Sequence, residues 1–277
     1  MTRAKPGRAG TAGRKSLRLA FVGWGAIART AAGLLTGAPV EIVAVATRGR
    51  SDLVDPPETA RLITDPGELT DIAPQVVAEA AGRESVAEWG PAALECGADF
   101  IVSSVSALAD ADVLTSLRSI AIGQGAQIHI QPGALAGVEA LAAARSLGLE
   151  TVEHRISKPP PAWLGTPAET LCNLDKLDKP YEFFSANAAE TATKFPKNAN
   201  VAMTTALAGV GPDQTKITLV ADPAATANCH RITAHGAFGD LDVTISNNPL
   251  PANPKTSAMA ALSLVRAIQN RTSAIVI

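Results

Sequence analysis

The sequence predicts an α/β protein in which a doubly wound, mostly parallel β-sheet is followed by a smaller α+β domain. Two observations predict this fold. From residue 17 to residue 149, short apolar runs alternate with helical patterns, which is typical of parallel strands covered by helices on both faces. Beyond that point four prolines and a glycine crowd residues 158–167, and the alternation stops.

The first elements form a βαβ unit. Residues 17–23 (LRLAFVG) are apolar and end in glycine, as a buried parallel strand does. A helix is expected over 26–35 and a second buried strand over 40–47, which completes the unit within about 30 residues. The alternation then continues through three strand and helix pairs: 75–81 with 84–96, 99–105 with 110–122, and 127–131 with 135–147.

After about residue 149 the regular alternation of strands and helices ends. Residues 158–167 are expected to be irregular and to lead into the second domain. A helix is expected over 188–207, which Pro196 must interrupt or start, and strands are expected over 216–221, 228–234 and 241–246. Met259, Leu262 and Val265 share a helical face within 255–268. The expected divisions are a tail at 1–16, domains at 17–149 and 150–250, and a C-terminal helix in 251–277 that packs back on the first domain.

Bulk composition excludes several classes of protein. The net charge is −2 and no basic face is evident, so nucleic-acid binding is not expected. No apolar run reaches the ~18 residues of a membrane span, and no secretory signal is visible. The three cysteines have no metal spacing and predict reduced thiols in a cytoplasmic protein. The one basic run, Arg3 to Arg18, predicts a disordered tail; a mitochondrial presequence is the alternative, although the run lacks a clear apolar helical face.

The strongest motif is GWGAIA at residues 23–28, a GxGxxA between the first strand and helix. Gly23 permits the tight turn, Gly25 lets a pyrophosphate approach the backbone, and a small side chain at Ala28 lets the helix sit close to the strand. Ala26 and Ile27 open the helix, whose N-terminus attracts phosphate. A Rossmann-type site for NAD or NADP is therefore expected; a glycine turn without a ligand is the alternative.

The end of the second strand bears on cofactor choice. An NAD-specific site has an acid about 20 residues after the motif, whereas this chain has Arg48 and Arg50 there. Guanidinium groups match phosphate oxygens, so we expect NADP to be accepted. The alternative is that both arginines are solvated loop charges.

Four further segments resemble the L-aspartate dehydrogenase family, and with the glycine motif the resemblance runs from about residue 17 to the C-terminus. They are QPGALAG (131–137), FPKNANVAMTTA (195–206), ADPAATANCHRI (221–232) and NPLPANPKTSAMAAL (248–262).

The resemblance implies an activity and a set of residues. The family oxidises L-aspartate reversibly to iminosuccinate with NAD(P); the imine hydrolyses to oxaloacetate and ammonia or feeds NAD synthesis. His230 corresponds to the catalytic histidine, and Ala134, through its backbone N–H, and Asn200 correspond to cofactor contacts. A homodimer formed through the second domain, which also binds the substrate, is implied as well.

The residues support these roles to different degrees. His230 shares a strand face with Asn228, and its imidazole titrates near neutrality, as a general base requires. Most strand histidines are structural, and His129, His154 and His235 are competitors; His129 is expected to be structural and His235 to be a second site residue. Asn200 could instead cap a helix.

The two carboxylates of aspartate require cations or N–H donors. Lys158, Lys197 and Lys255 are the candidates, with Arg155 and Arg231 behind them and Asn228 as a polar contact. Lys158 and Lys255 are expected in loops, and a solvated surface lysine is the alternative for each.

No metal is expected, because the histidines and cysteines lack ligand spacing. Two other functions compete with the family's activity. One is another two-domain NAD(P)-dependent oxidoreductase that acts on a small dicarboxylate, imine or semialdehyde. The other is a dinucleotide sensor without chemistry, which lacks support because no DNA-binding module is visible.

Overall fold

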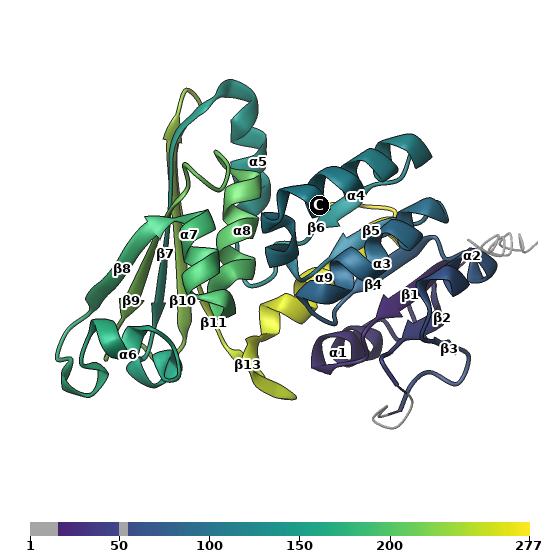
Figure 1. The fold of residues 1–277 in the computed structure, drawn as a ribbon, viewed down its shortest axis with the longest axis horizontal. Helices are drawn as coiled ribbons and strands as arrows, with labels where there is room; N and C mark the ends of the chain where they lie inside the picture. The colour runs from purple at the N-terminus through teal and green to yellow at the C-terminus, as the bar shows by residue number, and fades with distance from the viewer. Residues whose placement is uncertain (1–15, 50–54) are drawn as a thin grey trace, which may run out of the picture.

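The computed structural model describes residues 16–49 and 55–277 and contains two large sheets that lie side by side (Figure 1). The first is entirely parallel and has the order β3-β2-β1-β4-β5-β6. Its strands are β1 (Leu17–Val22), β2 (Val40–Ala46), β3 (Arg61–Ile63), β4 (Val76–Glu79), β5 (Asp99–Val102) and β6 (Ile128–Ile130). The order reverses between β1 and β4, where doubly wound sheets bind their ligands.

Helices cover both faces of this sheet. Leu19 and Phe21 pack toward α1 (Ala26–Leu34) and α9 (Ala258–Thr272), whereas Ala20 and Val22 pack toward α3 (Arg83–Glu95) and α4 (Ala111–Gln124). Side chains alternate along a strand, so apolar residues at successive positions mark burial on both faces. The short helix α2 (Leu69–Ile72) contacts α3 and packs on the same face.

The second sheet is mixed, with the order β11-β10-β7-β9-β8. Only β7 and β9 pair in parallel. Its strands are β7 (Leu149–Lys158), β8 (Tyr181–Asn187), β9 (Lys216–Ala221), β10 (Asn228–Gly236) and β11 (Gly239–Asn247). The helices α5 (Val138–Ala144), α7 (Ala188–Lys194) and α8 (Ala199–Ala208) pack on the face turned toward the first sheet (Figure 1).

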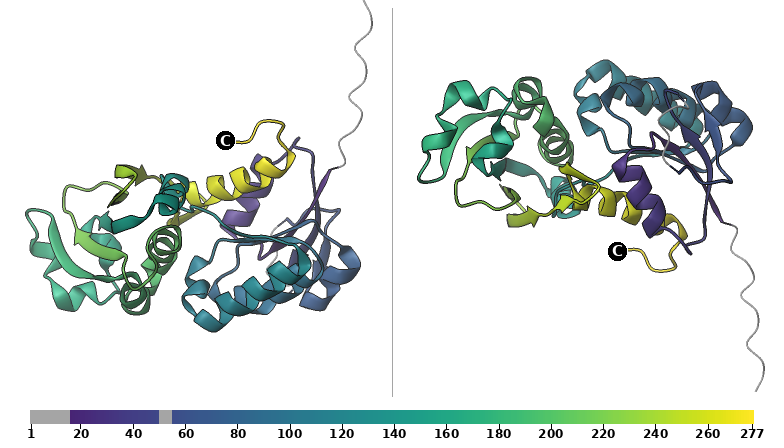
Figure 2. Two further views of the ribbon diagram at one scale, coloured as in Figure 1. Left: turned by 90° about the horizontal axis from the view of Figure 1, so that it is seen from above. Right: turned by 90° about the horizontal axis from the view of Figure 1, so that it is seen from below.

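The chain returns to the first sheet at its end. A two-stranded ribbon, β12 (Pro249–Leu250) and β13 (Asn253–Ser257), leads into α9, which lies along α1 (Figure 2). Leu264, Val265 and Ile268 bury their side chains there. Leu262, predicted on the inward face, is 44% exposed, so the inward face is rotated from the predicted one.

The predicted fold class is confirmed, and the strands and helices predicted for the first sheet are all present. Helix α5 begins at Val138 rather than at 135, because Gly133 and Gly137 hold a turn with φ of +63° and +74°. Strands β7 and β8 were not predicted, and Lys158 ends β7 instead of lying in a loop. The segment after it holds one 3₁₀ turn, Pro160–Trp163, and the short helix α6 (Ala168–Leu171) follows.

Some predictions fall outside the described residues or stay predictions. The basic tail lies almost entirely in residues 1–15 and Arg50 lies in 50–54, neither of which is described. The divisions at residues 149 and 250 stay predictions. Within residues 16–49 and 55–277, no helix has the length and apolarity needed to cross a membrane.

Candidate active site

The glycine turn follows β1 at the sheet's reversal point. Gly23 has φ of +88°, and a Cβ there would lie 2.6 Å from the Cβ of Ala81, so no other residue fits without backbone movement. Gly25 stands at the N-cap of α1, where no side chain caps the helix and a Cβ would meet nothing within 4 Å. Ala28 is fully buried against the sheet. The helix N-terminus is thus open to an anion.

A cavity of about 520 Å³ begins at this turn and reaches the end of β2. Gly23, Gly25, Arg48 and Trp89 are among its lining residues. Arg48 is exposed, and its guanidinium makes no hydrogen bond or ion pair with the described residues. The cavity has the size of a small-molecule site, with a cation at one end that has no partner among the described residues.

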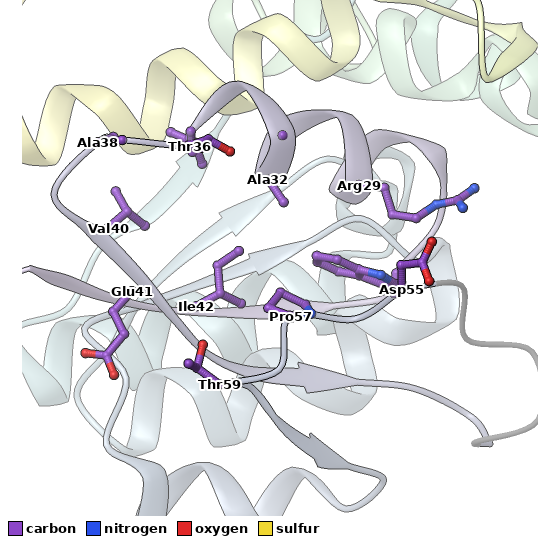
Figure 3. A pocket seen from close by; sticks show the side chains of 14 residues that line it. Arg29, Ala32, Thr36, Ala38, Val40, Glu41, Ile42, Asp55, Pro57 and Thr59 are labelled. Carbon is purple, nitrogen blue, oxygen red and sulfur yellow. The ribbon is translucent and has the colours of Figure 1, made fainter.

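A second cavity, of about 580 Å³, lies beside the first half of β2. Figure 3 shows Ala32, Val40 and Ile42 along it, with Arg29 and Asp55 at one end. No predicted site residue lines it. The cavity at the glycine turn is therefore the candidate cofactor site.

A buried carboxylate holds the loops beside the glycine turn. Glu79, the last residue of β4, is fully buried and accepts six hydrogen bonds. Its donors are the backbone N–H groups of Ala81, Gly82, Ser103 and Ser104 and the hydroxyls of Ser85 and Ser104, at 2.8–3.2 Å. Glu79 therefore ties the loop after β4 to the loop after β5.

Two amide side chains join the second part of the chain to the first. Asn200 Oδ1 on α8 accepts from the backbone N–H of Ser106 at 2.9 Å. The N-cap reading of Asn200 is wrong, because Asn198 holds that position. Asn247 Nδ2 donates to the carbonyl of Ala134 at 2.9 Å, while the N–H of Ala134 makes no hydrogen bond with any described residue.

His230 lies on the inward face of β10, as predicted, and is 4% exposed. Its Nδ1 lies 3.1 Å from Nε2 of His154 on β7, and Nδ1 of His154 lies 2.9 Å from the hydroxyl of Thr205 on α8. Burial, and then the nearby Lys158 cation, lower the pKa of His230 to about 3. Burial also holds the pKa of His154 well below its usual range. Both imidazoles are therefore neutral at neutral pH, and the expectation that His230 titrates near neutrality is wrong for the protein without substrate, because the ring is buried.

Lys158 is a cation without an acidic partner among the described residues. Its Nζ donates to Asn198 Oδ1 at 2.5 Å and lies 4.8 Å from the ring centroid of Trp163. Burial, and then the Lys197 cation, lower its pKa to about 8. Asn198 is 2% exposed, and its Nδ2 is buried without a hydrogen-bond partner in the described structure. A carboxylate would satisfy both groups.

Other candidates lie elsewhere. His235 is exposed on the opposite face of β10 and pairs with Asp240, so the structure does not place it beside His230. His129 is half-buried and bonds to Gln127. Arg155 and Arg231 form ion pairs with Glu182 and Asp242 on the outer face of the second sheet, Lys255 is exposed in β13 rather than in a loop, and Asn228 pairs in register with Asn247.

The sequence interpretation missed Glu79, Thr205 and Asn198 as site residues and gave His154 no role. The sequence did contain a signal for Glu79, because an acidic residue at the carboxyl end of a buried parallel strand requires hydrogen-bond donors nearby. The other three had none, because their contacts depend on how α8 packs on β7 and β10. Among the described residues, no group of three or more His, Cys, Asp or Glu side chains could hold a metal ion.

Comparisons with known proteins agree with the predicted resemblance. Residues 139–271 match the family described as "Aspartate dehydrogenase, C-terminal", and residues 23–131 match "Homoserine dehydrogenase, NAD binding domain". An aspartate dehydrogenase structure from Thermotoga maritima matches with a TM-score of 0.78 at 25% identity, covering 94% of this chain and 99% of that one.

Sequence relatives share the same name. The L-aspartate dehydrogenase of Polaromonas sp. is 41% identical over 94% of this chain and 100% of its own length. That of Brucella anthropi is 50% identical over 94% of this chain and 98% of its own length. Because such identity extends over nearly the whole chain, the protein belongs to the L-aspartate dehydrogenase family.

Proposed function

We propose that this protein catalyses the NAD(P)-dependent oxidation of L-aspartate to iminosuccinate, and the reverse reductive amination. The observation that carries the proposal is the pairing of a neutral imidazole, His230, with a nearby ammonium group, Lys158, that has no acidic partner among the described residues. A base and an anion site together suit an amino acid with carboxylate groups.

The glycine-turn cavity fits a nicotinamide dinucleotide. The open N-terminus of α1 and Gly25, which has no side chain, would hold its pyrophosphate, and Arg48, which has no partner among the described residues, would hold the 2′-phosphate of NADP. The proposed contacts of the cofactor's other half are the backbone N–H of Ala134, which has no hydrogen-bond partner among the described residues, and the amide of Asn200, whose Oδ1 already accepts from Ser106. When bound, the oxidised cofactor accepts the hydride from the substrate's α-carbon.

The protein's own residues supply the binding and the proton transfers. Lys158 and Asn198 would hold one carboxylate, with the Lys197 cation adding attraction. His230 would take the proton that the substrate's ammonium group must lose before its nitrogen can form an imine. In the hydrolytic step the same imidazole, once it has released that proton, would activate the water that attacks the imine carbon, and loss of ammonia from the resulting carbinolamine would leave oxaloacetate.

A steady-state assay of purified protein tests the proposed function. NAD(P)H oxidation should require both oxaloacetate and ammonia, and L-aspartate should be the preferred amino acid in the oxidative direction. Turnover of a semialdehyde or another carbonyl compound without ammonia would instead identify a different two-domain oxidoreductase. Cofactor binding without any turnover would identify a sensor.

We propose that Arg48 binds the 2′-phosphate of NADP. Arg48→Ala is expected to weaken NADPH binding about tenfold or more, because a charge-assisted hydrogen bond is lost, and to leave NADH binding unchanged. Fluorescence titration with each cofactor measures both constants. Arg118→Ala, an exposed arginine of α4, is the control. Equal NADPH affinity in the Arg48→Ala variant would contradict the role.

Lys158 gives a prediction about pH. Its pKa of about 8 means that the ammonium form, which attracts carboxylates, is lost as the pH rises above about 8. Succinate has no group that titrates there, so its competitive inhibition constant should rise up to about tenfold per pH unit from pH 8 upward. In Lys158→Arg, whose guanidinium stays charged, the same plot should be flat. A flat plot for the unaltered protein would show that Lys158 does not bind the dicarboxylate.

We also propose that two copies associate through the second sheet. The support is the family, and the proposed surface is the face of that sheet opposite α7 and α8, which carries exposed ion pairs such as Arg231 with Asp242. Sedimentation velocity measures the state directly, and a monomer at micromolar concentration would contradict it.

Two statements about cellular role complete the proposal. A cytoplasmic location is supported by the three cysteines, which are all free thiols. A role in NAD synthesis rests on the family alone. Deleting the gene and measuring the cellular NAD pool tests that role.

A further inference from the structure

Three side chains from three separate elements form a hydrogen-bonded line that ends at His230. His230 Nδ1 meets His154 Nε2 at 3.1 Å, and His154 Nδ1 meets the Thr205 hydroxyl at 2.9 Å. The same hydroxyl lies 3.1 Å from the carbonyl of Val201, one turn earlier in α8. His154 and Thr205 are fully buried, so this line is shielded from water.

The donors and acceptors along this line decide which nitrogen of each histidine carries its proton. The carbonyl of Val201 can only accept, so it takes the Thr205 proton, and the hydroxyl oxygen is then free to accept from Nδ1–H of His154. A neutral His154 that is protonated at Nδ1 must accept at Nε2. His230 must therefore carry its proton on Nδ1 and donate it to His154.

The opposite arrangement makes fewer bonds. If Thr205 donated to His154, then His154 would donate to His230, and the hydroxyl's bond to Val201 would be lost. That arrangement would also place a proton on His230 Nε2.

We propose that His154 and Thr205 are positioning residues that fix His230 as the Nδ1–H tautomer, so that its Nε2 lone pair is the base. The proposal deepens the proposed function and rests on His230 being the base of that reaction. Nε2 of His230 makes no hydrogen bond with any described residue, which leaves it available to a substrate proton or a water. An imidazole in the other tautomer would present N–H at that position and could not accept a proton.

The groups that face this line from each packed element are few. His154 comes from β7, Thr205 from α8, and Lys158 from the end of β7, with the Lys197 cation beyond it. No carboxylate is hydrogen-bonded to either imidazole among the described residues. The tautomer of His230 is therefore set by hydrogen-bond direction rather than by an acidic partner.

Thr205→Val tests the line, because valine keeps the shape and removes the hydroxyl. His154 then loses the acceptor that orients it, and kcat is expected to fall about tenfold to a hundredfold, the loss seen when orienting partners of histidine are removed at metal sites. The affinity for NADH, measured by fluorescence, should not change. Thr205→Ser, which keeps the hydroxyl, should restore most of kcat. Thr204→Val is the matched control, because among the described residues the neighbouring Thr204 hydroxyl bonds only to the carbonyl of Asn200.

Side-chain ¹H–¹⁵N NMR of histidine-labelled protein reads the tautomers directly. The protein has four histidines, and His230→Asn assigns the His230 signals. The unaltered protein at pH 7.5 should show both His154 and His230 protonated at Nδ1, and Thr205→Val should show Nε2–H at His230. A His230 signal protonated at Nε2 in the unaltered protein would overturn the proposal, as would unchanged kcat and tautomers in Thr205→Val.

The two proposals fail in different ways. If His230→Asn keeps its turnover, then the assignment of the base is wrong, whatever the tautomer. If His230→Asn loses turnover but the unaltered His230 is protonated at Nε2, then the base stands and its proposed positioning by His154 and Thr205 is wrong.

Discussion

His230→Asn is expected to lower kcat by about 10² to 10⁴, the range that general acid–base catalysis contributes. Asparagine suits this test because its amide can still donate toward His154 Nε2, as His230 Nδ1 does, while no basic nitrogen remains at the Nε2 position. The buried His154 thus keeps a partner, and the variant loses the base rather than the fold.

Two measurements make this result specific. The affinity for NADH should stay within about twofold, because His230 lies on β10 and the cavity at the glycine turn is lined by residues between 22 and 89. His235→Ala is the matched control. That histidine belongs to the same strand, faces the opposite side and bonds to Asp240, so its loss should leave kcat unchanged. Turnover of His230→Asn within about threefold of the unaltered protein would remove His230 from the mechanism.

The first sheet could be predicted because its strands and turns are marked by patterns within short stretches of the sequence. Strands buried on both faces are continuous apolar runs, and glycines mark the turns between them. Strand β3 was missed because its sequence, RLI, begins with an exposed arginine and forms neither an apolar run nor an alternation. Strand β7 was missed for another reason: Glu153 and Arg155 alternate with the buried Val152 and Ile156, so no apolar run exists. Alternation of this kind is the pattern of a half-buried strand.

The site residues also fall into those that local sequence pattern could predict and those that depend on tertiary packing. Alternation alone placed His230 on an inward face with Ile232 and Ala234, and those three are buried. The contact between His154 and His230 could not be predicted, because it depends on the register of β7 against β10, in which His154 lies opposite Ile232. A shift of one residue would turn His154 to the outer face. Buried polar networks are set by such tertiary details rather than by local pattern.

Glu79→Gln is expected to destabilise the fold more than any other single change proposed, by about 3 to 6 kcal/mol, because two hydrogen bonds to a charged acceptor are lost. One carboxylate oxygen becomes an amide NH₂, which cannot accept. If that group replaces Oε2, then it faces the N–H groups of Ser103 and Ser104. If it replaces Oε1, then it faces four donors instead. Neither orientation of the amide satisfies the site.

This destabilisation should extend to cofactor binding. The N–H groups of Ala81 and Gly82 both bond to Glu79, and Ala81 is the residue against which Gly23 is packed. Loosening that loop loosens the bend on which the dinucleotide would lie. We therefore expect the melting temperature to fall by at least about 6 °C, together with weaker NADH binding. Differential scanning calorimetry and fluorescence titration measure the two effects.

Glu95→Gln separates the chemistry of the substitution from its location. Glu95 is exposed at the end of α3 and makes no hydrogen bond or ion pair with the described residues, so the same exchange there should change stability by less than about 0.5 kcal/mol. Equal melting temperatures for Glu79→Gln and Glu95→Gln would mean that the six bonds to Glu79 do not hold these loops. A large difference with unchanged NADH affinity would limit Glu79 to the fold. If Glu79→Gln lowers both the melting temperature and the NADH affinity and Glu95→Gln lowers neither, then the buried carboxylate of Glu79 stabilises the loops at the sheet's reversal point and the cofactor cavity beside them.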